Sequence, residues 1–311
     1  MHLAKSRVLG LSAALATVSI WAAFLLVTRF AVNGNFTVEE VLILRLVPGA
    51  IVMIPVMLRL GVMPGKQSWP RAAMLMVGAS AVFPYVVSTG LAYAPASDGG
   101  ALAPGILPFW TALAAYAFTR EVPDMGRRFG LALILIGAMV VSLWQIFSGT
   151  DPDAWKGHLM FLTGSGCFAV YSVIFRQSGL SALHGMVIGL FWGTVFIVPL
   201  LMLSGNVTFA SVSLGDIVIM TVVQSLIIAI LATFLFNYAV NNLGAAESGA
   251  FGALTPILAL IGGAVFLGEA VTTLKVVGVL FVVVGVFLAS GIMPERQGFK
   301  FRKADFRSTA D

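Results

Sequence analysis

The stretch PFWTALAAYAFTRE at residues 108–121 returns 148 residues later as PILALIGGAVFLGE at residues 256–269. Both copies begin with proline and end with glutamate, and the match continues without a gap to Gly137 and Gly285. An earlier part of the chain, residues 10–29, repeats with an almost equal shift of 147. Two such shifts over most of the chain indicate an internal duplication with a unit of about 150 residues.

The composition is that of a membrane protein. Hydrophobic residues make up 59% of the chain and charged residues 10%, whereas soluble domains carry about 25% charged residues. A membrane-spanning helix needs about 20 apolar residues, and ten stretches meet this length: roughly 8–29, 38–58, 72–93, 98–119, 128–147, 158–176, 185–204, 214–238, 246–267 and 272–292. We therefore expect an all-α integral membrane fold, since a barrel would need alternating strands of about ten residues.

The duplication divides these ten spans into two halves. We expect a first repeat at residues 1–148, a second at 149–293 and a basic tail at 294–311. Each half holds five spans, an odd number, so the second repeat should enter the membrane upside down relative to the first. Inverted repeats of this kind are typical of secondary transporters that rock around a site near the middle of the bilayer.

The charges of the connecting segments predict the orientation. Fourteen Lys and Arg residues fall on the side that holds both termini, and three fall on the other side. The positive-inside rule therefore places both termini in the cytoplasm. The first apolar run, about 22 residues long, exceeds the apolar region of a secretory signal, so we expect it to remain as the first span.

Several short motifs together resemble a known family. They are IWAAF at residues 20–24, LRL at 44–46, YAPAS at 93–97, GAA at 244–246, and the doubled spacing from proline to glutamate to two glycines. The chain resembles EamA-type members of the drug/metabolite transporter superfamily over essentially its whole length. This resemblance implies a ten-helix inner-membrane permease that exports or exchanges amino acids or other small metabolites. The aromatic content is similar to that of the aromatic amino acid exporters of this family.

Pro108 and Pro256 are expected near the middle of their spans. A proline there removes a helical hydrogen bond and frees the carbonyl four residues earlier, at Pro104 and Gly252. In a membrane such a break is tolerated where protein or a water-filled cavity satisfies the backbone. We expect the two prolines to act as hinges that line the substrate path; the alternative is a kink that serves packing alone.

Four acidic residues lie near helix ends. Glu121 and Glu269 each precede a helix, and we expect them to accept hydrogen bonds from free backbone N–H groups rather than to carry protons. Asp98 and Glu247 begin the fourth and ninth spans. They could bind a substrate ammonium group, but capping is the expected use.

Arg45 is the one cation expected deep in a span. It lies about seven residues into the second helix, roughly 10 Å deep at 1.5 Å per residue. A cation at this depth is costly and is a functional candidate by default. Two interpretations stay open: contact with a substrate carboxylate, or a reach outward to Glu39, Glu40 or helix-end carbonyls.

Aromatic and neutral polar side chains near mid-depth form the expected substrate pocket. With Arg45, the predicted contacts are Trp21, Tyr85, Trp110, Phe168, Tyr171, Gln224, Asn237, Tyr238 and Thr255. Aromatic walls with few hydrogen-bonding groups suit a small, net-neutral, partly apolar molecule. Phosphorylated or nucleotide sugars are disfavoured, because they would require several basic residues.

The chain offers no pattern of an enzyme. The three histidines show no metal-ligand spacing, and no P-loop motif is present, so neither metal nor cofactor is expected. The expected partners are a small-molecule substrate and the lipid bilayer, with no nucleic acid, in a monomer or homodimer. The expected substrates are amino acids with aromatic or bulky apolar side chains. The alternatives are export of another metabolite or drug, or a channel; proton coupling, exchange and facilitated diffusion remain open.

Overall fold

The protein forms a bundle of helices joined by short loops. The computed structural model describes residues 2–148 and 152–289, and no β-strand occurs within these ranges. Nine helical segments of this part are long and apolar enough to cross a membrane, and a tenth apolar helix, α14 (Thr273–Ala289), has 17 residues. The expected all-α membrane fold is confirmed. The basic tail expected at residues 294–311 lies outside the described residues.

The ten spans follow one another along the chain. The first repeat contains α1 (His2–Val32), α2 (Val38–Leu60), α3 (Trp69–Val77) with α4 (Phe83–Tyr93), α5 (Ala96–Gly100) with α6 (Leu107–Thr119), and α7 (Met125–Ser148). The second contains α8 (Ala154–Ser178), α9 (Ala182–Leu203), α10 (Leu214–Thr221) with α11 (Thr233–Leu243), α12 (Ala245–Ala250) with α13 (Leu254–Leu267), and α14.

Side-chain caps fix where several of these helices begin. Thr37 accepts a hydrogen bond from the backbone of Glu40, whose carboxylate accepts one in return from the backbone N–H of Thr37. Ser181 and Ser213 accept comparable bonds at the starts of α9 and α10. Such caps satisfy N–H groups that have no partner within the helix.

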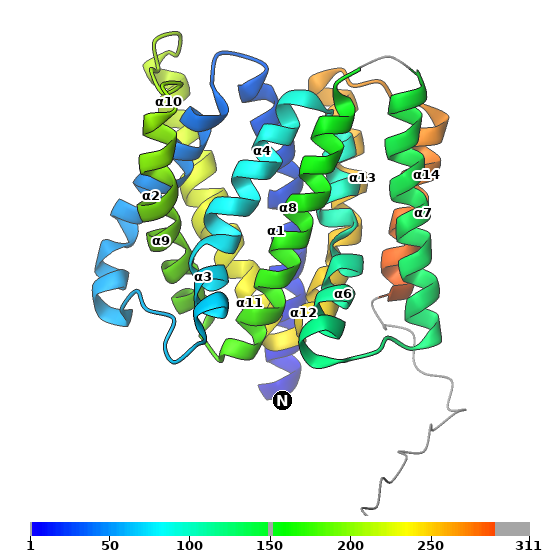
Figure 1. Cartoon of the computed structure of the whole chain (residues 1–311), viewed down its shortest axis with the longest axis horizontal. Coiled ribbons are helices and arrows are strands. Elements are labelled where there is room, and N and C mark those ends of the chain that lie inside the picture. Colours follow the sequence, from blue (N-terminus) through cyan, green and yellow to red (C-terminus); the bar gives the residue numbers. More distant parts are fainter. Residues whose placement is uncertain (1, 149–151, 290–311) are drawn as a thin grey trace, which may run out of the picture.

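The two repeats are inverted relative to each other. Figure 1 shows α1 beginning at the lower end of the bundle, beside the labelled N-terminus. We call this end the terminal face and the other end the opposite face. Five spans separate the start of α1 from the start of α8, so α8 begins at the opposite face and runs antiparallel to α1. Equivalent helices of the two repeats pack together, α2 against α9 and α7 against α14.

Four spans are interrupted near their middle. A π-helical segment separates α3 from α4 (Gly78–Val82), α5 from α6 (Ala101–Gly105) and α10 from α11 (Val222–Ala232). A short 3-10 turn separates α12 from α13 (Phe251–Ala253). These are the third, fourth, eighth and ninth spans, so the interruptions occur at equivalent places in both repeats. π-helical segments are rare and are frequently found at functional sites.

Pro108 and Pro256 lie in the first turn of the helix that follows an interruption. The residues four positions before these prolines, Pro104 and Gly252, meet where the fourth and ninth spans cross. A Cβ atom placed on Gly252 would lie 2.9 Å from the carbonyl oxygen of Pro104. The predicted breaks are therefore present and face each other, whereas the hinge function remains a prediction.

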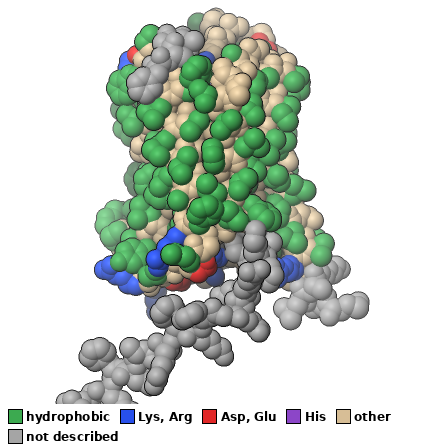
Figure 2. Space-filling view, turned by 90° about the vertical axis from the view of Figure 1, so that its right-hand side faces the viewer, with side chains coloured by type: hydrophobic (Ala, Val, Ile, Leu, Met, Phe, Trp, Pro, Cys, Tyr) green, Lys and Arg blue, Asp and Glu red, His purple; other side chains and the backbone are tan. Residues whose placement is uncertain are grey.

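The outer surface matches a bilayer environment. In Figure 2 hydrophobic side chains cover the middle of the visible face, and most of the visible Lys and Arg side chains gather at its lower end. Large apolar side chains such as Leu58, Phe266 and Leu203 are more than three-quarters exposed. An apolar belt of this kind is what lipid tails require, and the protein is a multi-pass membrane protein.

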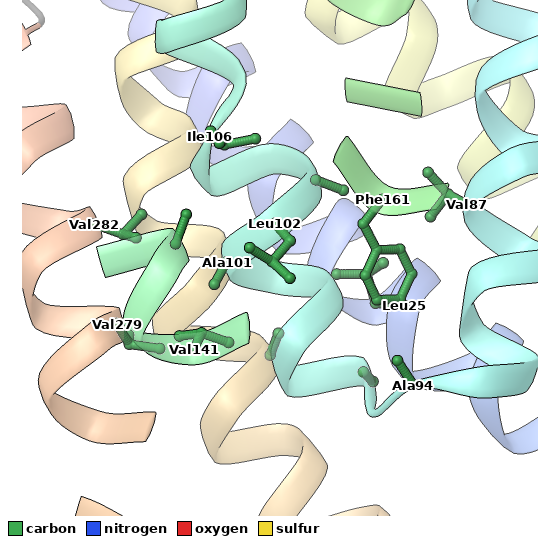
Figure 3. Close-up of a cluster of buried hydrophobic side chains, with 14 of the residues drawn as sticks. Leu25, Val87, Ala94, Ala101, Leu102, Ile106, Val141, Phe161, Val279 and Val282 are labelled. Carbon is green, nitrogen blue, oxygen red and sulfur yellow. The ribbon is translucent and has the colours of Figure 1, made fainter. Parts of the chain in front are cut away.

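The largest buried cluster joins the two repeats. Leu25, Val87 and Leu102 of the first repeat pack with Phe161 and Val282 of the second, and all five side chains are at most 1% exposed (Figure 3). Because these residues come from the first, third, fourth, sixth and tenth spans, the cluster holds both halves of the molecule in contact. It thereby fixes the positions of the helices around the pocket described next.

Candidate functional site

A small pocket lies half-way along the spans, between the two repeats. It is lined by Trp21, Phe24, Leu25, Phe83, Ala103, Pro104, Leu107, Ser165 and Phe168. We call it the central pocket. Its free volume is about 10 Å³, which is about enough for one water molecule. The polar group of its wall, Ser165, donates a 2.6 Å hydrogen bond to the carbonyl of Ala103.

Aromatic rings close this pocket by packing on one another. The ring of Phe168 lies 5.3 Å from that of Trp21 in an edge-on arrangement, 4.8 Å from that of Phe83 and 5.1 Å from that of Phe236. Such contacts stabilise by about 0.5–1.5 kcal/mol each beyond the burial of area. In this conformation the aromatic side chains fill most of the space between the helices that line the central pocket.

Arg45 lies beside the central pocket. Its guanidinium carbon is 4.9 Å from the centre of the ring of Phe24, which lines the pocket. The side chain is buried, and its Nη1 has no hydrogen-bond partner among the described residues. The reach toward Glu40 that the sequence left open is not observed, because that carboxylate accepts hydrogen bonds from the backbone of Thr208 and Phe209.

Further polar groups with unmet hydrogen bonds gather near Arg45. Gln224 donates a 2.9 Å hydrogen bond to Thr28, which lies one turn from Phe24 on α1. The Oε1 of Gln224 and the Oγ of Ser225 are buried and have no partner in the described part of the chain. Ser225 packs against Gly49, one turn from Arg45 on α2. Unpaired buried polar atoms cost about 1–3 kcal/mol each, so their concentration here points to a ligand that would supply the missing partners.

Of the ten predicted substrate contacts, only Trp21 and Phe168 form part of the wall of the central pocket. Tyr171 donates to Asn237, which itself donates to the carbonyl of Ala182, both at 3.2 Å. Trp110 packs against Gly166. Trp110 and Thr255 each have a buried polar atom without a partner in the described residues. The side chains of Tyr85 and Tyr238 are half-buried.

A larger cavity opens at the terminal face. Its volume is about 330 Å³, within the 300–1,000 Å³ range of small-molecule sites. The end of α6, the start of α7 and the end of α8 enclose it, together with Pro108. Its polar wall consists of Thr111, Thr119, Glu121, Arg127, Arg176 and Gln177. We call this cavity the vestibule.

The opposite face is closed by a buried group of charges. Asp98 Oδ1 lies 2.8 Å from Nζ of Lys275, and Asp98 Oδ2 lies 3.1 Å from Nε2 of His158. All three side chains are at most 4% exposed. Nζ of Lys275 also donates to Ser97, whose hydroxyl donates to Glu269 at 2.6 Å. We call these five residues the ion cluster.

Three expectations about helix capping are wrong. Glu121 accepts no backbone N–H group among the described residues, and Asp124 accepts that of Arg127 near the start of α7 instead. Asp98 forms no side-chain cap on α5, because Glu269 of the other repeat accepts the backbone N–H groups of Ala96 and Ser97 instead. Glu247 likewise forms no cap on α12 and pairs with Arg7 at 2.9 Å. Glu269 does cap a helix, as expected, although the helix belongs to the first repeat.

Sequence reasoning missed the ion cluster. Neither His158 nor Lys275 is among the site residues that the sequence predicts. A signal was present, since both residues lie within the first five positions of apolar helices. An ionisable side chain inside an apolar span is expected to have a partner, and Asp98 is the acid that supplies it.

Known proteins of similar sequence are transporters. The EamA-like transporter family matches residues 8–143 and again residues 155–291. A probable terminal-alkyne amino-acid exporter of Streptantibioticus cattleyicolor is 27% identical over 278 residues, covering 88% of this chain and 90% of that protein. The uncharacterized transporter YyaM of Bacillus subtilis is 24% identical over 256 residues, covering 78% of this chain and 81% of that protein.

A solved structure shares the fold. A protein crystal structure superposes with a TM-score of 0.63 at 18% sequence identity, over 93% of this chain and 97% of that one. Two family matches cover both repeats, and the bundle has the apolar spans that a transporter in a bilayer needs. The protein is therefore a transporter of small molecules rather than an enzyme, and the chain belongs to the EamA-like transporter family.

Proposed function

We propose that the protein exports net-neutral amino acids with aromatic or bulky apolar side chains across the cell inner membrane. Transport would proceed by alternating access around the central pocket, and the terminal face would be cytoplasmic. The support for this orientation is the excess of basic residues, fourteen against three, on the side that holds the termini.

Arg45 is the residue that most supports an amino acid as the substrate. A lone guanidinium inside a span costs about 3 kcal/mol on insertion scales, and here its Nη1 lacks a partner among the described residues. A substrate carboxylate would provide charge-assisted hydrogen bonds to it. The free oxygen atoms of Gln224 and Ser225 are suitable acceptors for the ammonium group of the same amino acid.

The aromatic wall suits the side chain of such a substrate. Trp21, Phe83 and Phe168 meet at the central pocket, and Arg45 lies against Phe24, which lines the same pocket. An apolar or aromatic side chain would replace the ring-on-ring contacts that now fill the pocket. We propose Trp110 and Thr255 as further contacts, since each has a buried polar atom without a partner in the described part.

The conformation supports loading from the cytoplasm. The vestibule has a volume of about 330 Å³ at the terminal face, whereas the central pocket has about 10 Å³. At the opposite face Asp98, His158 and Lys275 of the ion cluster are buried. An exporter receives its substrate in such an inward-facing conformation. Opening of the Phe168 and Trp21 contact would then admit the substrate to the central pocket.

One relative supports an amino acid as the substrate. The Streptantibioticus cattleyicolor protein, which matches 88% of this chain, is a probable exporter of terminal-alkyne amino acids. Such an amino acid carries both the carboxylate and the ammonium group that the polar atoms around Arg45 are proposed to bind. Its side chain is apolar, which agrees with the aromatic wall.

Counterflow in liposomes tests the proposal. Purified protein would be reconstituted into vesicles preloaded with unlabelled phenylalanine, and entry of labelled phenylalanine, tryptophan, threonine and lysine would be measured. Saturable entry of the two aromatic amino acids is expected. Arg45→Gln should reduce it by about tenfold or more, the effect of losing about 1.5–3 kcal/mol of charged hydrogen bonding.

Arg59→Gln is the matched control, because Arg59 is an exposed residue of the same helix. It should transport like the wild type. Failure of all four amino acids to enter, from protein shown to be folded, would contradict an amino acid substrate. Undiminished transport by Arg45→Gln would remove Arg45 from the site.

A further inference from the structure

We propose that the ion cluster is a proton-binding site that couples export to the proton gradient, with His158 as the residue that takes up the proton. This inference rests on the proposed function, because it assigns the driving force of the same transport cycle. Asp98, His158 and Lys275 are not part of the central pocket or the vestibule, and the amino acid site described above leaves them without a role.

The geometry identifies the atom that receives the proton. Nε2 of His158 lies 3.1 Å from the carboxylate of Asp98, and an ionised carboxylate can only accept hydrogen bonds. Nε2 therefore carries the hydrogen atom in neutral histidine, and Nδ1 presents its lone pair. Nδ1 is buried and has no partner among the described residues, so it is free to bind a proton.

The charges of the cluster are incomplete without that proton. Asp98 and Glu269 carry two negative charges, and Lys275 carries one positive charge, so the cluster has a net charge of −1 when His158 is neutral. One proton on His158 brings the net charge to zero. Burying a charge is costly unless it is paired, and protonation should therefore favour the conformation in which this end of the bundle is closed.

Other ionisable groups around the cluster already have contacts of their own. Lys156 lies 2.7 Å from Asp153 and also faces Tyr93, and Arg29 donates to the carbonyl of Leu91. Lys156 thus contacts both Asp153 and Tyr93, and Glu269, itself a member of the cluster, accepts hydrogen bonds from Ala96 and Ser97. None of these contacts occupies Nδ1 of His158.

The position of the cluster links protonation to movement. Asp98 belongs to α5 of the first repeat, whereas His158 and Lys275 belong to α8 and α14 of the second. Rocking of one repeat against the other would open this end and expose His158 to the outside. On the same helix Ser165 lines the central pocket, seven residues or about 10 Å from His158. A proton released after closure would leave in that direction.

The resulting cycle exchanges one proton for one substrate molecule. With the opposite face open, Nδ1 of His158 takes up a proton from outside, and the neutralised cluster closes. With the terminal face open, Nδ1 releases this proton toward the cytoplasm, and the amino acid binds. The single bond that forms and breaks is the N–H bond of the imidazole. Substrate moves outward as the proton moves inward.

The test compares His158→Gln with His184→Gln. Glutamine retains an N–H donor for Asp98 but cannot bind a proton, and His184 is a partly exposed residue at the start of α9, outside the cluster. Three measurements are made: counterflow of labelled phenylalanine without a gradient, accumulation of phenylalanine in acid-loaded vesicles, and nitrogen NMR of histidine-labelled protein between pH 5 and 8. The chain has only three histidines, so the signal missing from His158→Gln identifies His158.

Wild type and His184→Gln should accumulate phenylalanine several-fold in acid-loaded vesicles. His158→Gln should keep counterflow but lose this accumulation, and the His158 signal should change with pH. Gradient-driven accumulation by His158→Gln would overturn the inference. A His158 signal that does not respond to pH would also overturn it, because the cluster would then be a fixed group of ion pairs that binds no proton. This NMR result does not depend on which substrate the protein carries. Counterflow that fails in the wild type would contradict the proposed function separately.

Discussion

The guanidinium of Arg45 lies over the ring of Phe24, with 4.9 Å between the guanidinium carbon and the ring centre. A cation over an aromatic face gains about 0.5–2 kcal/mol, which is less than the cost of about 3 kcal/mol for placing arginine deep in a span. Since Phe24 lines the central pocket, the uncompensated charge is held next to the space where a substrate would bind. This uncompensated charge beside the pocket is the reason why we propose Arg45 as a binding residue.

Replacement of Arg45 by methionine should therefore raise stability while abolishing transport. Methionine removes the burial cost of the charge and retains packing against Phe24, so thermal unfolding in detergent should show a gain of about 1–2 kcal/mol. Arg59→Met, at an exposed position of the same helix, serves as the control and should leave transport intact. Loss of stability on Arg45→Met would show that the guanidinium supports the fold.

Replacing the two equivalent glutamates, Glu121 and Glu269, should have unequal effects on the stability of the protein. Glu269 accepts hydrogen bonds from the backbone of Ala96 and Ser97 and from the Ser97 hydroxyl, whereas Glu121 is exposed and lines the vestibule. Glu269→Gln should destabilise the protein by about 1.5–3 kcal/mol, and Glu121→Gln by less than about 0.5 kcal/mol. Thermal unfolding of the two variants measures the difference. Equal losses would show that the hydrogen bonds of Glu269 contribute no more to stability than the exposed carboxylate of Glu121 does.

The contact between α7 and α14 should not tolerate a larger residue at Gly137. A Cβ atom there would lie 2.5 Å from the carbonyl oxygen of Gly278 and 2.8 Å from the backbone nitrogen of Val282. Gly137→Val must push the two helices apart, at a cost of about 1–3 kcal/mol or more. Gly215→Ala, where the nearest atom is 3.7 Å away, is the control. An unchanged melting temperature for Gly137→Val would show that this helix pair is loosely packed.

The duplication predicted the architecture well because it depends on order along the chain. Ten apolar stretches and an odd number of spans per repeat are sufficient for an inverted bundle. Pro108 and Pro256 mark the interruptions of the fourth and ninth spans, whereas those of the third and eighth spans were not predicted. Side-chain direction is harder to predict. In helices that are apolar on every side the periodicity that marks a buried face is weak. Depth therefore selected Trp21 and Phe168, which line the central pocket, together with Tyr85 and Tyr238, which do not.

Contacts between the repeats could not be predicted from single spans. Asp98 and His158 are 60 residues apart, and each looks like a residue near a helix end when its own span is considered alone. Lys275 joins them only because the tenth span packs beside the fourth. The exchange of caps, in which Glu269 of the second repeat caps α5 of the first, likewise depends on how the two repeats dock.

Pro108 provides the sharpest test of the interrupted spans. It lies in the first turn of α6, directly after the π-helical segment Ala101–Gly105. Pro108→Ala restores a backbone N–H and favours a continuous helix by up to about 3 kcal/mol. We expect a lower maximal rate of phenylalanine counterflow with an unchanged half-saturation concentration, because the change stiffens the helix without altering the pocket wall. Pro55→Ala, at an exposed position inside α2, should transport like the wild type. A full transport rate in Pro108→Ala would show that the break serves packing alone.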